Sequence, residues 1–465
     1  MNHPTGRLAA FVGNTRYEEL SDDVVKKVKE CFQDTLGCIL EGSKGEEFQK
    51  AFTAMNLLGE GSSRIFGTDE RTSLQNSVLL HALMAHATEF DDSHKQSKTH
   101  PGAVIIPAAL GAAWLHGKIS GKQLIASIAA GYEVTLRLGK ALGAGEHRLK
   151  GWHATATCGI FGAAAAAASI LGLDAERIMS ALGSAGTQAA GIWAFTSDGS
   201  MSKPLHAGKA AQGGLISAVL AQTGFTGSRY ILEAEDGGFF KAFAPYKTSD
   251  WQQELLHGLE SPDAYEILNV AYKPYPCCRT THGAIEAALH IQQKQNVPVE
   301  QIKRVVIRTY DVAVKQCGFS EPLNPRLAAF SFAYVVAVAL RSKRPIVSAD
   351  FSEQVFRDTE ILELHRKVTV ERSEEMDALF PKLWPCEVEV ETAAGEIYKH
   401  RVDIAKGDPL SPLSDVERVG KFRGCADGVL PPSQIDGIVA AVNHLEDIED
   451  LRPITELLIS AKKIT

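Results

Sequence analysis

The residue types that could carry chemistry are most concentrated between Glu89 and His100. Three carboxylates and two imidazoles occur there within twelve residues, namely Glu89, Asp91, Asp92, His94 and His100. Crowded acids and histidines shift one another's pKa values and suit general acid–base catalysis. The alternative is a solvated loop in which Asp91 or Asp92 caps the next helix. The composition of this segment leaves both interpretations open.

Two shorter segments place histidine and lysine at predicted helix starts. His153 follows a glycine and a tryptophan and precedes an alanine-rich stretch, although a lone histidine there is more often structural. Lys203 and His206 flank Pro204, a residue typical of a first helical turn. The N–H groups of that turn favour an anion, and Lys203, His206 and Lys209 would add positive charge. An exposed basic turn is an equally good interpretation.

A fourth segment, from Lys273 to His282, contains two prolines that would stiffen it. Tyr275, Arg279 and His282 follow one another closely. A guanidinium binds carboxylates through paired hydrogen bonds, and an imidazole moves protons near neutral pH. These residue types therefore suit anion binding combined with acid–base work. The same segment could also be a hinge between domains, and the two interpretations are compatible.

Metal and nucleotide sites are not indicated by the motifs. The sequence has no HExxH and no CxxC, and His81 and His86 are five residues apart, off a shared helical face. Gly143 and Gly145 lack the third glycine of a dinucleotide fingerprint, and neither a P-loop nor a GxSxG elbow occurs. We therefore expect no metal and no other cofactor.

The composition restricts the partners. The chain has 465 residues, of which 45% are hydrophobic and 22% charged, as in a globular protein of at least two domains. With a net charge of −8 and no basic block, we expect neither a nucleic-acid nor a membrane partner. The N-terminus lacks a signal-peptide pattern, and the eight scattered cysteines fit a reducing compartment, so a cytoplasmic location is expected.

The elements that must position these groups are predicted to be helices over about the first 260 residues. Ser21 and two aspartates form a helix start, and Val24, Val28 and Phe32 then recur at helical spacing. Six further segments rich in alanine, leucine and isoleucine are each bounded by glycine or proline: 74–88, 103–117, 121–142, 157–172, 175–191 and 207–223. Their small residues predict close contacts between helices.

The pattern changes after about residue 265. The segment 303–310, KRVVIRTY, predicts a strand, and alternation with period two predicts a hairpin of strands at 387–392 and 397–404. Helical patterns occur at 282–294, 327–341 and 432–445. We therefore expect a mainly α protein with a large helical domain and a smaller α+β lid domain. The expected boundaries are 1–265 for the helical domain, completed by about 410–465, and 266–409 for the lid.

The four segments, in this order, resemble the MmgE/PrpD family. EFDDSHKQSKTHPG resembles the family's D-F-D-D-[ST]…H-P motif, and GWHATATCGIFG, MSKPLHAGKAAQGG and KPYPCCRTTH resemble its other signatures. AFSFAYVVAVAL and the late KGDPLSPLS also fit. Each motif is modest alone, but the ordered set is specific and the resemblance covers nearly the whole chain.

The resemblance implies a helical domain built from both chain ends, an α+β lid, a homodimer, and catalysis without an iron–sulfur cluster. The family's motif residues fall on Glu89, Asp92, His100, His153, Lys203 and His282, which we expect to be catalytic. Ser93 stands at the motif's hydroxyl position. We expect it to bind substrate together with His206, Tyr275 and Arg279.

Two positions depart from the family pattern. Glu89 stands where the family usually has aspartate, so its carboxylate reaches one methylene further. Ala329 replaces the lysine of an A-K-F-S motif, which removes a positive charge near the lid. Both departures bear on which substrate is accepted.

The expected function is that of a cofactor-independent lyase acting on a small di- or tricarboxylate, like 2-methylcitrate dehydratase or cis-aconitate decarboxylase. Lys203, Arg279 and the helix starts would hold carboxylates. A neutral imidazole from His100, His153 or His282 would take a proton next to a carboxylate, and a second histidine or the lysine would return one. The alternatives are an epimerase or isomerase of a dicarboxylate such as iminodisuccinate, and a non-catalytic carboxylate-binding member of the fold.

Overall fold

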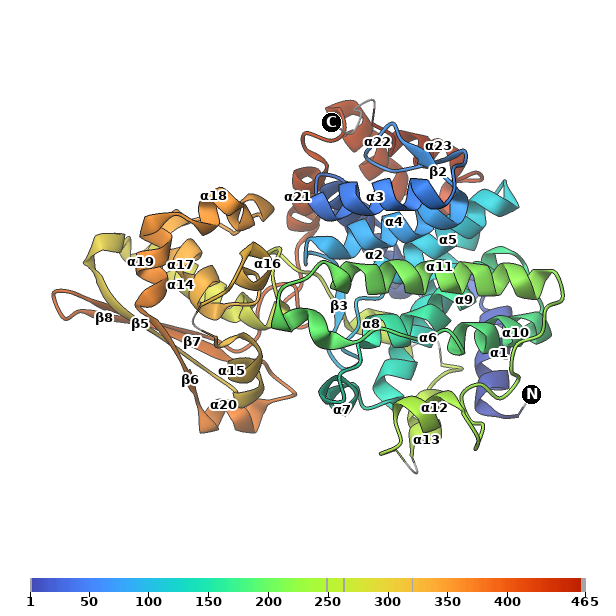
Figure 1. Ribbon diagram of the computed structural model, residues 1–465, viewed down its shortest axis with the longest axis horizontal. Coiled ribbons are helices and arrows are strands. Elements are labelled where there is room, and N and C mark those ends of the chain that lie inside the picture. Colours follow the sequence, from blue (N-terminus) through green and yellow to red (C-terminus); the bar gives the residue numbers. More distant parts are fainter. Residues whose placement is uncertain (1, 248–249, 262–263, 320, 461–465) are drawn as a thin grey trace. The chain divides into compact units, whose positions relative to one another are not determined.

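The computed structural model describes residues 2–247, 250–261, 264–319 and 321–460. The prediction of a mainly α fold is confirmed (Figure 1). The chain divides into two compact units. The helical unit comprises 1–194, 201–271 and 414–465, and the mixed unit comprises 195–200 and 272–413. None of the described helices is long and apolar enough to cross a membrane.

The helical unit is built around long helices whose starts follow the sequence signals. The Ser21 side chain accepts a hydrogen bond from the Val24 N–H at the start of α2, as predicted. Its helices are α1 (Pro4–Asn14), α2 (Asp22–Gly42), α3 (Glu46–Leu58), α4 (Leu74–Ala87), α5 (Gly102–His116), α6 (Gly121–Ala141), α7 (Ala144–Leu149), α8 (Ala154–Thr157), α9 (Gly159–Ile170), α10 (Ala175–Gly186), α11 (Ser202–Gln222), α12 (Phe239–Phe243), α13 (Trp251–Leu256), α21 (Asp415–Ala426), α22 (Pro432–Asn443) and α23 (Arg452–Leu457).

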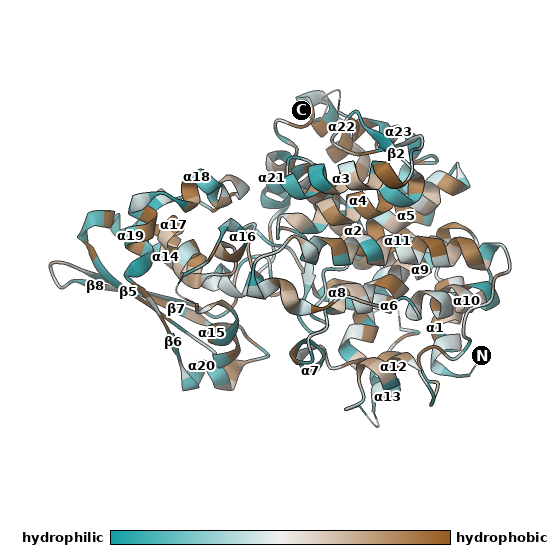
Figure 2. Ribbon diagram, viewed as in Figure 1, coloured by the Kyte–Doolittle hydropathy of each residue, from teal (hydrophilic) through white to brown (hydrophobic). Residues whose placement is uncertain are grey.

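Small residues allow the central helices of this unit to approach closely, as the sequence predicts. A Cβ atom added at Gly162 of α9 would lie 1.9 Å from the Thr135 Oγ1 and 2.4 Å from the Gly131 carbonyl oxygen, both on α6. Figure 2 shows hydrophobic residues concentrated on α5 and hydrophilic residues on α21. The helix predicted to extend to residue 191 ends at Gly186, and Gly191 adopts a φ of 116°.

Two short antiparallel ladders in the helical unit were not predicted. The first pairs β1 (Ser63–Arg64) with β2 (Arg71–Thr72), and the second pairs β3 (Ser93–His94) with β4 (Val270–Ala271). The strands β3 and β4 have two residues each, which is too short to show a periodicity in the sequence. They also lie far apart in the chain, so their pairing leaves no local signal. This ladder fixes the backbone directly after Asp92.

The mixed unit contains a four-stranded sheet in the order β6-β5-β7-β8. The three predicted strands are confirmed as β5 (Ile302–Thr309), β7 (Cys386–Thr392) and β8 (Ile397–Val402), whereas β6 (Val368–Arg372), which runs parallel to β5, was missed. The helices of this unit are α14 (His282–Gln295), α15 (Asp311–Cys317), α16 (Pro325–Ala328), α17 (Phe332–Ser342), α18 (Glu353–Phe356), α19 (Thr359–Arg366) and α20 (Glu374–Leu379).

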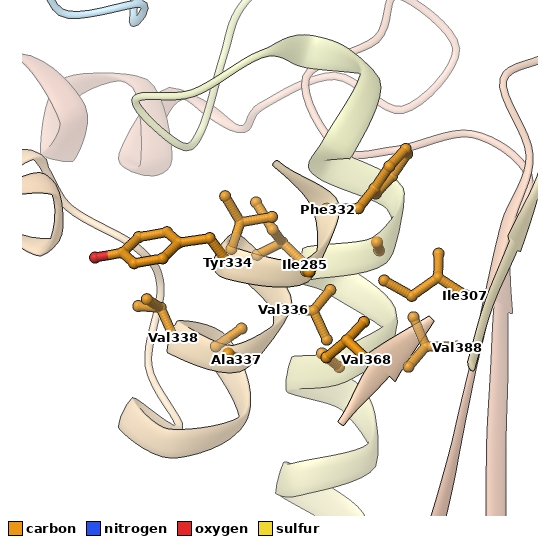
Figure 3. Packing of buried hydrophobic residues seen from close by; sticks show 14 of the residues in the cluster. Ile285, Ile307, Phe332, Tyr334, Val336, Ala337, Val338, Val368 and Val388 are labelled. Atoms are coloured by element: carbon orange, nitrogen blue, oxygen red, sulfur yellow. The ribbon is translucent and has the colours of Figure 1, made fainter. Parts of the chain in front are cut away.

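The core of the mixed unit lies between its sheet and two helices. Ile285 of α14 and Val336 of α17 belong to the same buried cluster as Ile307, Val368 and Val388 of the strands (Figure 3). These side chains are apolar and almost fully buried, so the hydrophobic effect stabilises the helix–sheet packing. The start of α14, at His282, is thereby fixed.

Candidate active site

The connection between α4 and α5 carries the acidic cluster inward rather than into solvent. His86 lies in the last turn of α4, and Asp91 and Asp92 are both fully buried. Glu89 adopts a φ of 54°, a left-handed conformation that is unfavourable for a residue with a side chain. Such strain concentrates at functional sites. The solvated-loop alternative does not fit this burial.

Asp91 lies between two imidazoles. Its Oδ2 is 2.6 Å from the Nδ1 of His86, and its Oδ1 is 3.4 Å from the Nδ1 of His100. The His100 Nδ1 is also 2.8 Å from the Asp92 carbonyl oxygen. The rings of His86 and His100 are 4.9 Å apart between centroids. The His86–Asp91–His100 group is therefore a compact, buried acid–base assembly.

Asp92 makes a different set of contacts. Its Oδ1 accepts a hydrogen bond from the Gly102 N–H at 3.0 Å, and its Oδ2 accepts one from the Tyr132 hydroxyl at 2.8 Å. Burial, and then the negative charge of Asp34, raise the pKa of Asp92 to about 8. Asp92 thus holds the start of α5 against α6, and its carboxyl is mostly protonated at neutral pH.

Lys203 and Glu89 form a buried ion pair between α11 and the acidic segment. Lys203 lies in the first turn of α11 and is only 5% exposed. A buried ammonium requires a charged or strongly polar partner, and the Glu89 carboxylate supplies one. The pair therefore brings positive charge and a helix N-terminus to the same place.

His153 is buried among other imidazoles. Its ring stacks with that of His86 at a centroid distance of 5.6 Å, and its Nδ1 is 3.1 Å from the Nδ1 of His206. Burial, and then electrostatic repulsion from the neighbouring basic groups His86, Lys203, His206 and His100, hold the pKa of His153 well below its usual range. The imidazole is therefore neutral at neutral pH.

The backbone around His153 is fixed by the segment after α10. The His153 N–H donates to the Gly191 carbonyl oxygen at 3.0 Å, which requires the positive φ of that glycine. The Trp193 ring meets the His153 ring edge-on at 5.0 Å, and the Arg148 guanidinium lies 4.1 Å above the tryptophan. An aromatic wall and a cation therefore border the imidazole.

His206 links His153 to a pocket of about 270 Å³. Its side-chain wall includes Gln188, Lys209 and Gln212, and the Lys209 Nζ donates to the Gln212 Oε1 at 2.5 Å. Burial, and then the charge of Lys203, lower the pKa of His206.

Ser93, the predicted hydroxyl ligand, is half-buried on β3, where its backbone pairs with Ala271.

The remaining predicted residues lie in the mixed unit, at the start of α14. The His282 Nδ1 is 3.1 Å from a terminal nitrogen of Arg279, and its Nε2 is 3.3 Å from the Cys277 carbonyl oxygen. Arg279 also donates to the Ala405 carbonyl oxygen at 2.9 Å, and burial lowers its pKa. The Tyr275 ring meets His282 edge-on at 5.2 Å. Tyr275, Arg279 and His282 thus form one connected group.

One group of described side chains could hold a metal ion, and it is the His86–Asp91–His100 group. Its ligand atoms lie within 4.8 Å of one another, and two imidazoles with a carboxylate suit several divalent metals. The 2.6 Å separation of the His86 Nδ1 and the Asp91 Oδ2 is a normal length for a charge-assisted hydrogen bond. The contact between these two atoms is therefore accounted for by a hydrogen bond.

Comparison with known proteins places this arrangement in a family. The MmgE/PrpD N-terminal domain matches residues 6–252, and the MmgE/PrpD C-terminal domain matches residues 275–447. The chain belongs to the MmgE/PrpD family. It is 28% identical to the cis-aconitate decarboxylase of Aspergillus terreus over 98% of this chain and 95% of that one. The cis-aconitate decarboxylases of Mus musculus and Homo sapiens are each 29% identical, over 98% of this chain and 93% and 94% of theirs.

The structure of this family member draws attention to three residues that the sequence did not single out as site candidates, His86, Trp193 and Lys273. His86 lies on a helix whose other residues are largely apolar, so its pattern resembles that of a core position. Trp193 follows a glycine-containing turn without a recognisable motif. Lys273 is only 1% exposed and is the first residue of the Lys273–His282 segment. The two prolines that follow it closely were the sequence feature that could have marked it as a site candidate.

Proposed function

We propose that this chain is a decarboxylase of a small tricarboxylate, with cis-aconitate as the first substrate to test. Its full-length likeness to decarboxylases makes it an enzyme and a lyase. The observation that carries the proposal is the electrostatic coupling, within the helical unit, of the buried Lys203 and His153 to the half-buried His100. We further propose that the enzyme needs no metal or other cofactor and works as a homodimer.

The chemistry requires an anion site and a proton donor. When a C–CO₂ bond breaks, its electron pair stays on carbon, and a neighbouring double bond and carboxylate can delocalise it. A proton must then reach carbon. Lys203 and the N-terminus of α11 would hold a substrate carboxylate, since both favour negative charge. Glu89 would orient the Lys203 ammonium.

His153 would be the proton donor in this mechanism. In the free enzyme, burial and surrounding positive charges keep it neutral. A bound polyanion offsets those charges and raises the imidazole pKa, so the imidazole acquires a proton only when substrate is present. The acid is thereby coupled to occupancy of the site.

The other predicted residues complete the proposal. His100 would act as the partner acid–base group, and Ser93 and His206 would bind substrate. Arg279 and Tyr275 would contribute carboxylate ligands, and His282 would hold or move a proton. Asp92 would act indirectly, by holding the start of α5.

A product assay tests the function. The purified enzyme is incubated with citrate, 2-methylcitrate, cis-aconitate and iminodisuccinate in deuterated water, and products are identified by mass spectrometry. We expect CO₂ release and one deuterium incorporated on carbon with cis-aconitate. Loss of water would indicate a dehydratase, and deuterium exchange without loss of mass would indicate an epimerase. Either result, or no turnover of any of the acids, contradicts the proposal.

Two substitutions test the residues. His153→Ala and Lys203→Ala should each lower kcat/KM by at least about a hundredfold, since acid–base groups contribute about 10²–10⁴. His147→Gln is the matched control, because His147 is a buried histidine that contacts Thr157 at 2.8 Å outside the cluster. Full turnover by either alanine variant, with the fold intact, would exclude its assigned role.

A further inference from the structure

We propose that Asp91 is a positioning residue that fixes which nitrogen carries the proton in the His86 imidazole. The proposal concerns the decarboxylase site proposed above and rests on that function for its kinetic readout. It assigns a role to an aspartate and a histidine that the motif comparison leaves without one. The argument depends on two relations, the hydrogen bond between the Asp91 carboxylate and His86 and a separate hydrogen bond that holds His100.

The first relation is with His86. An ionised carboxylate only accepts hydrogen bonds, so the 2.6 Å contact between the Asp91 Oδ2 and the His86 Nδ1 requires the proton on Nδ1. The His86 Nε2 is buried and makes no hydrogen bond to any residue that the structure describes. When the His86 ring is neutral, its lone pair therefore lies on Nε2, and the ring stacks with that of His153.

The second relation concerns His100. Its Nδ1 is 2.8 Å from the Asp92 carbonyl oxygen, which is its hydrogen-bond acceptor, and 3.4 Å from the Asp91 Oδ1, which contributes its negative charge. In the neutral ring the proton therefore lies on Nδ1 and the lone pair on Nε2, through the Asp92 carbonyl rather than through Asp91. The His100 backbone is also held, because its N–H donates to the Thr155 hydroxyl at 3.2 Å. The Nε2 of His100 would thus be the nitrogen that acts in acid–base chemistry.

Burial makes the carboxylate effective in this role. Asp91 and His86 are both fully buried, so their interaction is little screened by solvent. A carboxylate that orients an imidazole through Nδ1 recurs wherever the other nitrogen must act on a substrate or metal. Asp92 cannot substitute for Asp91, since its carboxyl oxygens contact Gly102 and Tyr132.

The kinetic test is Asp91→Asn, which preserves shape but replaces a pure acceptor by a group that also donates. We expect kcat on cis-aconitate to fall by about a hundredfold while KM changes less than about threefold, since groups that orient ligands are worth about 10–100-fold. Glu133→Gln is the matched control. Glu133 is also a fully buried carboxylate, but it pairs with Arg137 and the Ile267 N–H outside the cluster. Its kcat should stay within about twofold of wild type.

A second measurement needs no substrate and therefore separates this proposal from the proposed function. Protein labelled with ¹⁵N-histidine is examined by long-range ¹H–¹⁵N correlation NMR. We expect the signals of His86 and His100 to report a proton on Nδ1 in the wild type, and the His86 signal to change in Asp91→Asn. The His81 signal should not change, since its Nε2 accepts the Phe66 N–H at 2.9 Å in both proteins.

A third test uses two variants of His86 and applies if Asp91→Asn does not fold. His86→Asn keeps a donor near the Nδ1 position, whereas His86→Ala removes it. We expect His86→Asn to retain at least about tenfold more activity than His86→Ala. Unchanged kcat in a folded Asp91→Asn protein, or an unchanged His86 signal, would overturn the proposal. Equal activity of the two His86 variants would overturn it as well.

Discussion

Asp91 and Asp92 are adjacent in the chain, yet their carboxyl groups meet different partners. Asp91 faces the Nδ1 atoms of His86 and His100, whereas Asp92 receives the Gly102 N–H and the Tyr132 hydroxyl. The first arrangement stabilises an ionised carboxylate beside imidazoles, and the second accompanies a carboxyl with a raised pKa. Residue type and spacing could not separate the two roles, because both depend on side chains that come from other elements.

The raised pKa of Asp92 leads to a prediction about stability and pH. In the unfolded chain the carboxyl ionises near pH 4, and in the folded protein it ionises near pH 8. Between these values the folded state binds the extra proton, so stability is present at low pH and is lost as pH rises towards about 8. In the Asp92→Asn variant the side chain cannot ionise, so its stability does not decrease with pH for this reason.

We therefore expect the free energy of unfolding of Asp92→Asn, relative to wild type, to increase steadily from pH 5 to pH 8. Urea denaturation at several pH values in this range measures the difference. A constant difference across the range would contradict the assigned pKa. The effect of the substitution at pH 5 serves as the reference, since the folded forms of both proteins are then neutral at this position.

At the scale of elements, the crossing of α6 and α9 sets the relative positions of residues in the candidate site. His153 precedes α8 and α9, and Tyr132 on α6 holds Asp92. The two helices meet where Gly162 lies against Gly131 and Thr135. A side chain at Gly162 would force the helices apart, because the atoms it meets include backbone.

Gly162→Ala should therefore lower the free energy of unfolding by about 3 kcal/mol or more, even though alanine favours helix more than glycine does. Gly424→Ala is the control, since a Cβ atom at this position of α21 meets nothing within 4 Å. It should raise stability by up to about 1 kcal/mol. Urea denaturation midpoints measure both, and a neutral Gly162→Ala would show that the crossing tolerates expansion.

The elements themselves follow from the sequence to the extent that their signals are local. The helical periodicity, the capping serine at position 21, the strand-forming residues of β5 and the alternation in β7 and β8 each lie within a short window. The β3–β4 ladder and β6 were missed. Their pairing partners lie far away in the chain, and short strands lack a period of their own.

At the scale of the whole molecule, the last segment of the chain returns to support the acidic segment. Lys421 of α21 donates to the Asp34 carboxylate of α2 at 2.6 Å and to the Phe90 carbonyl oxygen at 2.6 Å. Burial disfavours the charged amine, but Asp34 outweighs it and raises the pKa of Lys421. Residues almost 400 positions apart are thus joined by one buried charge pair beside Glu89.

Lys421→Met should lower the free energy of unfolding by about 3–5 kcal/mol, because Asp34 would remain buried without its cation. Lys44→Met is the control, since the Lys44–Glu41 pair is a partly exposed contact within one turn and should contribute less than about 1 kcal/mol. Thermal and urea denaturation compare the two. Similar losses in both variants would contradict the importance assigned to the buried pair.

The sequence by itself determined the mainly helical class, the family and the four segments that could carry chemistry, because residue type, spacing and periodicity are local properties. Only the tertiary structure decided which groups in those segments meet. It separated Asp91 from Asp92, added His86 to the cluster, paired Lys203 with Glu89 and surrounded His153 with imidazoles. The physical reason is that burial and hydrogen-bond partners set what an ionisable group can do, and both come from distant parts of the chain.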